Sequence, residues 1–553
     1  MNLHTFYINA ISSGLRRDAA EVLLGDFDEE RRADTVHAKR GEAYAFARGV
    51  TMDFPGNSVF GSDQAWDCVI RLLDRVCEWM HDDGTWSWYL PTTKKTHTIN
   101  YSWSLLYWMR LVEDFGDRLG SERCGRLDRM FRATLSSRYK AAKRYLIDPL
   151  SKSTSLNIFT HWILELWYGG RLLDESEWEG IGEEVMRQII SLQFVDGYWP
   201  DSNVHRGPVG NYNIITLWGV STYALYSNDR SALEAVRRAA DYHFYLSYPD
   251  GSCVETVDER NRHHVGTVNP KLVCSLAPFP ETRPYAAHFA ERLMANMAPA
   301  ELDVGGAAPF CDALHAVPDS EVVPLGRGDF RREFATIPAL VERRGPWYAC
   351  LSGATTDVPG GMFHHDLQNH LSIWHDDAGL VIGGGNSLHD PPFSSFRFDS
   401  CYLAGGGEVA VVDGVCSLRL RYGEIEAHVE VILVDDYTIA IRACSQGHLP
   451  ADSEFAVHLP GRFGEACRTS YGDVPMDDRS IYRAGGGDAG DFSVGALTFA
   501  SQSLWRIEWP QTPVNIYNLP LRLPVESAVM RLAARLEGKP VEVRITIGRG
   551  ERG

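Results

Sequence analysis

The 553-residue sequence lacks the features that define several large classes of protein. No stretch reaches the roughly 18 apolar residues of a membrane-spanning helix, so no membrane partner is expected. The 11 cysteines form neither a CxxC pair nor a dense framework, which indicates free thiols in a reducing compartment. The first residues show no basic stretch followed by an apolar one. We therefore expect a cytoplasmic protein, or a secreted or periplasmic one if a signal has been removed.

Positive charge is also scarce, because 73 Asp and Glu residues outnumber 54 Lys and Arg residues and the formal net charge is −19. Such a surface repels nucleic acid and anionic lipid, so neither is expected as a partner. An anionic substrate then requires a local group of cations. The stretch 138–144 could supply some of them, although it also fits a solvated helix face. The candidate cations are Lys94, Lys95, Arg138, Lys140, Lys143, Arg144 and Arg206.

The first 300 residues carry apolar side chains at helical spacing. Hydrophobic residues make up 44% of the chain, which is enough for a large core. In the segment 63–81, for example, Trp66, Ile70 and Leu73 fall on one face of a helix. Helices are predicted for 63–81, 100–115, 124–146, 157–170, 178–194, 211–226, 230–247 and 283–297.

A repeat runs through this helical region. The pieces HDDGTWSW, FVDGYWPDS and YPDGSCVET each follow a predicted helix, and their glycines are Gly84, Gly197 and Gly251. The glycines lie 113 residues (84 to 197) and 54 residues (197 to 251) apart, as expected if one intervening unit has lost its Asp-Gly. A period of roughly 55 residues fits helical hairpins that stack into a ring. Asp-Gly also simply ends helices, but that does not explain the spacing.

From Trp347 onward the pattern changes to short alternating runs such as EVAVVDG and YTIAIRACS, separated by turn clusters. Runs of this kind without helices between them indicate an antiparallel sandwich. The stretch before them is rich in Gly, Pro and Ala and is typical of a linker. The predicted class is therefore α+β and multidomain: an (α/α) toroid of helical hairpins over 1–300, a linker over 301–345 and an antiparallel β-sandwich over 346–553.

Residues 196–219, DGYWPDSNVHRGPVGNYNIITLWG, hold the side-chain types that β-elimination on a uronic acid requires. The carboxylate charge must be neutralised, a base must remove the C5 proton, and an acid must protonate the departing O4. Tyr212 and His205 are candidates for base and acid, and Asn203 and Arg206 are candidates for binding the carboxylate. A purely structural role for this loop is the alternative.

Two further substrate-binding candidates come from the same region. Asn157 and His161 lie four residues apart on one helical face and would complete the carboxylate site. A buried, mutually satisfied pair has the same spacing. Aromatic residues follow the Asp-Gly pieces, and sugar rings stack on aromatic planes, so Trp199 is a candidate for substrate binding. Core packing is the alternative for any single tryptophan.

Histidines crowd the segment GGMFHHDLQNHLSIWHDDAGLVIGGGNSLHD. Zinc binds His and Asp side chains, so a divalent metal in the His364–His375 region is one interpretation. The spacing of His365, His370 and His375 fits no short zinc motif, because residues five apart on a strand point to opposite faces. No cofactor or metal is therefore expected. We expect instead a histidine that reaches from the sandwich into the toroid cleft, and His370 is a candidate for substrate binding.

The order of toroid and sandwich, together with HHDLQNHLSIWHDDAGLVIGGGNS, resembles the heparinase II/III-like polysaccharide lyases and their alginate-lyase relatives. In that group a His-rich run leads into a strand, a Gly-containing turn and a second strand. The resemblance implies a Tyr acid/base, placed at Tyr212, and histidines from both domains, placed at His205 and His365. It also implies a carboxylate-binding Asn, placed at Asn157, and an acidic poly- or oligosaccharide as substrate.

Two other functions fit the sequence. A glycoside hydrolase on the same toroid needs two carboxylates about 5–9.5 Å apart. A non-catalytic glycan-binding protein would use the aromatic residues alone. The carboxylates available to a hydrolase are Glu255, Asp258, Asp196, Asp201 and the pair Asp82 and Asp83.

Overall fold

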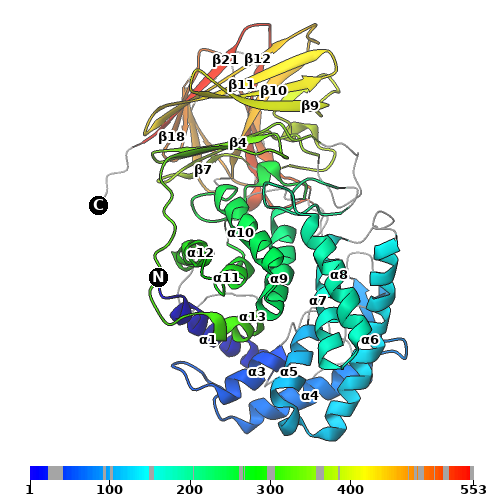
Figure 1. Ribbon diagram of the computed structural model, residues 1–553. Coiled ribbons are helices and arrows are strands. Elements are labelled where there is room, and N and C mark those ends of the chain that lie inside the picture. The colour runs from blue at the N-terminus through cyan, green and yellow to red at the C-terminus, as the bar shows by residue number, and fades with distance from the viewer. Residues whose placement is uncertain are drawn as a thin grey trace. The chain divides into compact units, whose positions relative to one another are not determined.

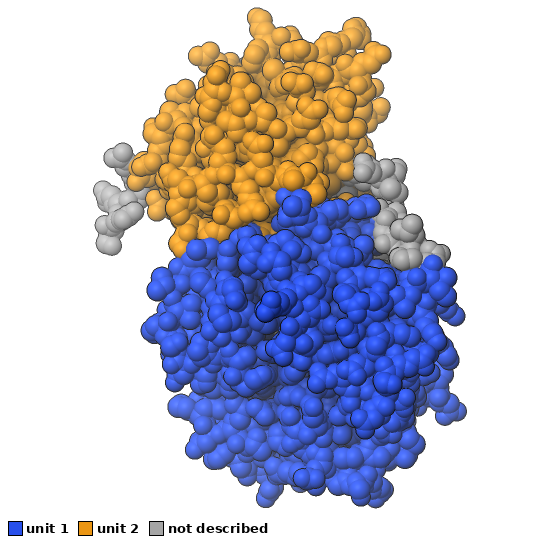
Figure 2. Space-filling view, viewed as in Figure 1, with its two compact units in different colours: residues 1–206, 211–241, 267–325 blue, residues 207–210, 242–266, 326–553 orange. Residues whose placement is uncertain are grey.

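A computed structural model shows an N-terminal (α/α) toroid followed by an antiparallel β-sandwich, which confirms the predicted fold class (Figure 1). The chain forms two compact units, made of residues 1–206, 211–241 and 267–325, and of residues 207–210, 242–266 and 326–553 (Figure 2). The structure describes residues 1–22, 42–90, 95–99, 104–147, 155–202, 205–260, 266, 268–295, 306–355, 366–383, 386–461, 463–470, 472–478, 482–483, 491–503, 505–514 and 522–548.

The predicted helices are present, with ends that differ by a few residues. The structure adds α1, α3, α11 and α13, and a hairpin of β1 (Trp86–Leu90) and β2 (Lys95–Ile99). None of the helices in the described part of the chain combines the length and apolar character needed to cross a membrane. The helices are α1 Leu3–Val22, α3 Glu42–Thr51, α4 Asp63–Trp79, α5 Leu105–Leu119, α6 Ser121–Ile147, α7 Leu156–Leu172, α8 Ser176–Ser191, α9 Gly210–Ser227, α10 Arg230–Tyr245, α11 Pro270–Leu276, α12 Arg283–Ala295 and α13 Ala308–Ala313.

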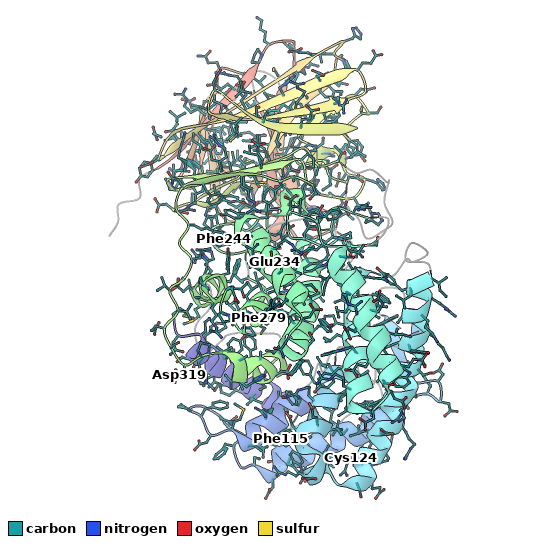
Figure 3. The ribbon with its side chains drawn as sticks, viewed as in Figure 1. Phe115, Cys124, Glu234, Phe244, Phe279 and Asp319 are labelled. Atoms are coloured by element: carbon teal, nitrogen blue, oxygen red, sulfur yellow. The ribbon has the colours of Figure 1, made fainter. Side chains whose placement is uncertain are left out.

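Consecutive helices pack as hairpins, and alternate helices form two layers. Helix α5 contacts α3 and α7, whereas α6 contacts α4 and α8. Phe115 of α5, labelled in Figure 3, packs its ring against Trp66 of α4 with centroids 5.9 Å apart. Helix α4 begins at Ser62, whose side chain accepts a hydrogen bond from the Ala65 amide and so caps the helix.

The predicted period of roughly 55 residues is confirmed by the contacts between helices of the inner layer. His161 of α7 contacts Ile215 of α9, 54 residues later, and Ser221 of α9 contacts Ser275 of α11, also 54 residues later. Near the other end of α7, Arg171 donates to the carbonyl of Tyr226, 55 residues later. Helices α7 and α9 are therefore parallel neighbours along their whole length.

The three Asp-Gly pieces fold into turns with the same hydrogen bonds. Gly84, Gly197 and Gly251 have φ of 79°, 100° and 87°, a conformation that favours glycine. Each glycine amide donates to the carbonyl three residues earlier, at distances of 2.8–2.9 Å. The tryptophan after each of the first two turns donates its ring N–H to the preceding helix, Trp86 to the Val76 carbonyl and Trp199 to the Ile189 carbonyl.

The expectation that Trp199 stacks on substrate is therefore wrong. Its side chain is 1% exposed, and its ring nitrogen and main-chain amide are both hydrogen-bonded, to the Ile189 carbonyl at 3.0 Å and to Asn213 Oδ1 at 3.2 Å. Trp199 locks the second turn onto α8, as Trp86 locks the first turn onto α4. The side chains of Trp88 and Tyr89 lie outside the described residues.

A network of polar side chains joins the inner helices near the C-terminal halves of α7 and α9. Asp312 of α13 accepts hydrogen bonds from Arg110 Nε of α5 at 3.0 Å and from the Tyr226 hydroxyl of α9 at 2.6 Å. Arg110 also donates to the Tyr168 hydroxyl of α7 at 2.8 Å. Four helices are thus joined through one buried carboxylate.

The second unit contains three described sheets in which every pairing is antiparallel. A nine-stranded sheet has the order β15-β14-β17-β18-β21-β12-β11-β10-β9, and two five-stranded sheets have the orders β16-β19-β20-β13-β8 and β3-β4-β5-β6-β7. The strands are β3 Phe330–Glu333, β4 Ala339–Arg344, β5 Trp347–Ser352, β6 Leu371–His375, β7 Gly379–Ile382, β8 Phe396–Phe398, β9 Gly406–Val412, β10 Val415–Tyr422, β11 Ile425–Asp435, β12 Thr438–Gln446, β13 Ser453–Pro460, β14 Ala466–Thr469, β15 Gly472–Pro475, β16 Tyr482–Arg483, β17 Phe492–Val494, β18 Leu497–Ala500, β19 Trp505–Gln511, β20 Val529–Arg535 and β21 Val541–Ile547.

All three sheets contribute to one hydrophobic core, for example through Leu351 of β5, Leu420 of β10 and Leu532 of β20. In β10 and β11 the buried residues alternate with more exposed ones, as expected for strands with one face on the core. The 11 cysteines are all free, which agrees with the prediction from their spacing.

The division of the chain differs from the predicted one. The expected linker over 301–345 contains α13, β3 and β4, and residues 242–266 belong to the same unit as the sandwich. Arg327 shows why, because it donates to the carbonyls of Ser247 at 2.8 Å and Tyr248 at 2.9 Å and to that of Phe244, labelled in Figure 3. Tyr248 also stacks on Trp374 of β6, with ring centroids 5.5 Å apart.

Candidate active site

The starts of α7 and α9 are held together by hydrogen bonds. Asp201, in the loop before α9, accepts a hydrogen bond from the Ser155 hydroxyl at 2.7 Å, and its carbonyl accepts one from the Leu156 amide at 2.8 Å. One turn into each helix, Nε2 of His161 lies 3.2 Å from the Ile215 carbonyl. The predicted site residues of α7 and of the 196–219 segment are therefore brought to the same end of neighbouring helices.

His161 is a buried and neutral imidazole. Its pKa is lowered from 6.5 to about 3, first by burial and then by the charge of Lys271. Since the Ile215 carbonyl can only accept, Nε2 carries the proton of the neutral ring and Nδ1 carries the lone pair. The ring also packs on Trp218, with centroids 4.6 Å apart. At this place His161 therefore supplies neither a positive charge nor a second N–H donor for a carboxylate.

Lys271 supplies the positive charge at this place, and sequence reasoning missed it. Its ammonium group lies 4.1 Å from the centre of the Trp218 ring, in a cation–π geometry. Trp218 stacks in turn on Tyr107 of α5, with centroids 6.2 Å apart. Lys271 is the second residue of α11, a helix of only seven residues, which carries no clear periodicity. The repeat could have predicted that Lys271 lies near Trp218, because the two residues are separated by nearly one period.

The candidate residues of the 196–219 segment lie outside the hydrophobic core. Tyr212, in the first turn of α9, and His205 are half-buried, and Arg206 is exposed. The His205 amide donates to Ser202 Oγ at 3.1 Å, which orders the loop. The Arg206 guanidinium lies 5.2 Å from the centre of the Phe194 ring. Asn203 lies outside the described residues.

Asn157 is buried next to His161, at 5% exposure, and its side-chain oxygen accepts a hydrogen bond from the Ile158 amide at 2.8 Å. This bond leaves the side-chain NH₂ as the group with which Asn157 would bind a carboxylate. Of the other predicted cations, Arg138 is fully buried in an ion pair with Glu165, and Lys140, Lys143 and Arg144 are exposed on α6. The backbone at Lys94 and the side chain of Lys95 lie outside the described residues.

The histidines of the later segment do not form a shared site within the described residues. His364 and His365 lie outside those residues. His370 is 1% exposed, its Nδ1 lies 2.9 Å from the Ser352 carbonyl, and burial lowers its pKa to about 4. His375 is likewise buried, and its ring lies 2.9 Å from the Asp436 carbonyl. In the described ranges no three His, Cys, Asp or Glu side chains converge as metal ligands.

The carboxylates predicted for a hydrolase are buried or used in turns. Asp258 is 1% exposed and accepts hydrogen bonds from the Gly210 amide at 2.6 Å and the Arg260 amide at 2.7 Å. Glu255, Asp196 and Asp201 are at most 6% exposed. Asp82 and Asp83 are exposed in the first Asp-Gly turn, where Asp83 accepts from the Thr85 amide at 3.1 Å.

Comparison with solved structures identifies the fold. The chain is similar to the chondroitin AC lyase of Streptomyces coelicolor A3 in complex with chondroitin sulphate, with a TM-score of 0.57 and 12% identity over 99% of this chain and 80% of that chain. It is also similar to a heparinase III, with a TM-score of 0.51 and 11% identity over 99% of this chain and 83% of that one. The fold is that of heparinase-like polysaccharide lyases. No family model and no curated protein matches the sequence.

Proposed function

We propose that this protein is a polysaccharide lyase that cleaves an acidic, uronic-acid-containing poly- or oligosaccharide by β-elimination. The polysaccharide-lyase fold supports the class of reaction. The observation that carries the proposal is the meeting of α7 and α9 at His161 and Ile215. This contact, together with the packing of Lys271 on Trp218 of α9, supports a site that includes Asn157, Lys271 and Tyr212.

In the proposed reaction, Tyr212 and His205 form the acid–base pair. The base removes the C5 proton, the C4–O4 bond breaks as the C4–C5 double bond forms, and the departing O4 takes up a proton from the acid. Both residues suit this work by their exposure, because a half-buried side chain reaches solvent and substrate while its backbone is held by neighbouring elements. His365 stays a predicted catalytic residue and lies outside the described residues.

Neutralisation of the uronate carboxylate is assigned to Lys271, with a hydrogen bond from the side-chain NH₂ of Asn157. Removal of the C5 proton places negative charge on the carboxylate, so a nearby cation lowers the barrier. His161 lacks that charge because its pKa is about 3. The Lys271 ammonium and the exposed Arg206 are the local cations that an anionic substrate requires on a chain with net charge −19.

A glycoside hydrolase is less well supported. The hydrolytic pair must reach the glycosidic bond with both carboxylates. Asp258 and Asp201 instead accept hydrogen bonds from the main chain and from the Ser155 hydroxyl, and both are buried. Trp199, the aromatic residue named for glycan stacking, is buried as well.

The test is incubation with a panel of polyuronates and glycosaminoglycans, followed by the ultraviolet absorbance of the unsaturated uronide product. The wild type should produce this absorbance with at least one polymer. Tyr212→Phe should reduce the rate by about 100- to 10,000-fold, the usual contribution of general acid–base catalysis. The matched control is Tyr139→Phe, since Tyr139 lies on α6 and bonds Lys143 and Glu177.

Three outcomes count against the proposal. New reducing ends without the absorbance indicate hydrolysis. Saturable binding without either product indicates a glycan-binding protein. Equal rates for wild type and Tyr212→Phe, with both proteins folded, remove Tyr212 from the mechanism.

A further inference from the structure

The third Asp-Gly turn differs from the first two at one position. Where Trp86 and Trp199 lock the earlier turns, this turn has Cys253. Gly210, the first residue of α9, lies against it, because a Cβ placed on Gly210 would come 3.1 Å from both Cβ and Sγ of Cys253. Small residues on both sides therefore let the chain that enters α9 pack directly on the third turn.

Two carboxylates that follow this turn bind the entering chain through its main-chain groups. Asp258 Oδ2 accepts a hydrogen bond from the Gly210 amide at 2.6 Å, and Glu259 Oε1 accepts one from the Gly207 amide at 3.1 Å. The Glu259 amide donates to the Pro208 carbonyl, also at 3.1 Å. Hydrogen bonds with a charged acceptor are stronger than neutral ones. The short segment 207–210 is thus held at both of its ends.

Asp258 also satisfies the start of a helix from outside that helix. The first amides of a helix have no acceptor within it and carry a partial positive charge, which a carboxylate stabilises. The side chain of Asp258 is enclosed, at 1% exposure, and its second oxygen accepts from the Arg260 amide at 2.7 Å. Both oxygens are therefore committed to the main chain, and the carboxylate cannot turn without losing one bond.

Gly207 is adapted to the same contact. A Cβ at this position would lie 2.1 Å from Glu259 Oε1, which is closer than any real contact. Any side chain at residue 207 would therefore displace the carboxylate. The glycines at 207 and 210 allow the two carboxylates to approach the backbone.

We infer that Asp258 and Glu259 are positioning residues for the proposed elimination, because they fix residues 207–210, which join His205 and Arg206 to Tyr212. Tyr212 lies two residues beyond Gly210, and Arg206 lies one residue before Gly207. The inference rests on the proposed function, since these carboxylates act only through Tyr212 and Arg206. Neither of them takes part in the chemistry.

The attachment of residues 207–210 to Asp258 and Glu259 is tested by amide hydrogen exchange, which does not depend on activity. Asp258→Ala should raise the exchange rate of the Gly210 amide at least tenfold, and Glu259→Ala should do the same for Gly207. The matched control is Asp250→Ala, because Asp250 accepts hydrogen bonds from the amide of Ser252 at 2.9 Å and from its hydroxyl at 2.6 Å, within the same turn. An unchanged exchange rate of the Gly210 amide in Asp258→Ala would show that Asp258 does not hold residues 207–210.

The positioning role is tested by steady-state kinetics on a polymer that the wild type cleaves. A misplacement of about 1 Å can cost 100-fold in rate, so Asp258→Ala should lower kcat by up to about 100-fold with KM within twofold. Asp258→Asn, which keeps an acceptor oxygen, should restore much of that loss. Faster exchange with unchanged kcat, or a rise in KM alone, would overturn the positioning role.

The two proposals fail in different ways. If the wild type binds a polyuronate but forms no unsaturated product, the proposed function fails, and the positioning role fails with it. If the wild type is active and Tyr212→Phe is not, the function holds, and only the Asp258 and Glu259 variants decide the inference.

Discussion

The two ends of the parallel helices α7 and α9 use polar residues in opposite ways. Near their C-terminal halves, Arg110, Asp312 and Tyr226 bind one another, so positive and negative groups are matched. Near their starts, the Lys271 ammonium lies over the Trp218 ring and the His161 imidazole is neutral. Removing one partner of a buried ion pair is strongly destabilising, whereas a cation over an aromatic ring is the charge that an anionic substrate is proposed to meet. The comparison separates a structural end of the helices from the end that carries the proposed functional site.

The largest expected effect is on stability, at the structural end. Asp312→Ala removes a buried acceptor of both Arg110 and Tyr226, and breaking a buried ion pair costs about 3–5 kcal/mol. We expect a loss of this size in the free energy of unfolding measured with urea, without a change in KM. Glu184→Ala is the control, because its pair with Arg187 is about half exposed and should contribute less than about 1 kcal/mol. Equal losses in the two variants would contradict the assignment.

At the functional end the expected effect is on rate. Lys271→Met keeps a long apolar side chain against Trp218 but removes the charge. Loss of one group that stabilises developing negative charge costs about 100- to 1000-fold, so kcat/KM for a polyuronate should fall by that factor. Lys143→Met is the control, since Lys143 is exposed and pairs with Glu177. A variant that keeps wild-type rates would remove Lys271 from the site.

The pH dependence of stability should report the neutral His161. Its pKa is about 3 in the folded protein and 6.5 ordinarily, so between these values the unfolded chain binds the proton more tightly. The stabilisation is complete above pH 6.5 and is lost as the pH falls, by up to about 1.4 kcal/mol for each pH unit. The free energy of unfolding at pH 7 and pH 5 should differ less in His161→Gln than in wild type. An equal difference in the two proteins would contradict the buried, neutral state of His161.

The smallest effect is expected at Trp199. Trp199→Phe removes the ring N–H that donates to the Ile189 carbonyl, which keeps the Leu192 amide as a donor at 3.1 Å, and one such hydrogen bond contributes about 0.5–1.5 kcal/mol. We expect a loss near the lower limit in thermal or urea unfolding, with KM unchanged because the ring is 1% exposed. A raised KM at unchanged stability would return Trp199 to the substrate site.

Local patterns predicted the helical layers well. The boundaries of α4, α6 and α7 follow from apolar residues that recur every three or four positions, and the Asp-Gly turns follow from glycine at positive φ. Helix α11 was missed because seven residues carry too little periodicity. The β1–β2 hairpin was also missed, because its strands are short and the surrounding sequence has helical spacing.

The sheet arrangement and the site were less predictable, because both depend on contacts distant in sequence. Alternation in β10 and β11 indicates which residues face a core, but it does not indicate that three sheets share that core. Tyr212 and His161 were chosen by residue type and spacing. Whether Trp199 faced solvent or the carbonyl of Ile189 depended on a partner ten residues away, and the role of Lys271 depended on packing across two helices.

The order of the two units along the chain has a practical consequence for dissecting the protein. The backbone passes from one unit to the other five times, at 206, 210, 241, 266 and 325. A fragment that ends at residue 325 would retain Tyr248 but lose Trp374, on which its ring stacks, and Arg327, which binds its carbonyl. The complementary fragment would expose Tyr348, which is fully buried in the intact chain and donates to the Tyr245 carbonyl at 2.8 Å. Neither half is a natural module, so assays of binding or turnover require the full-length polypeptide.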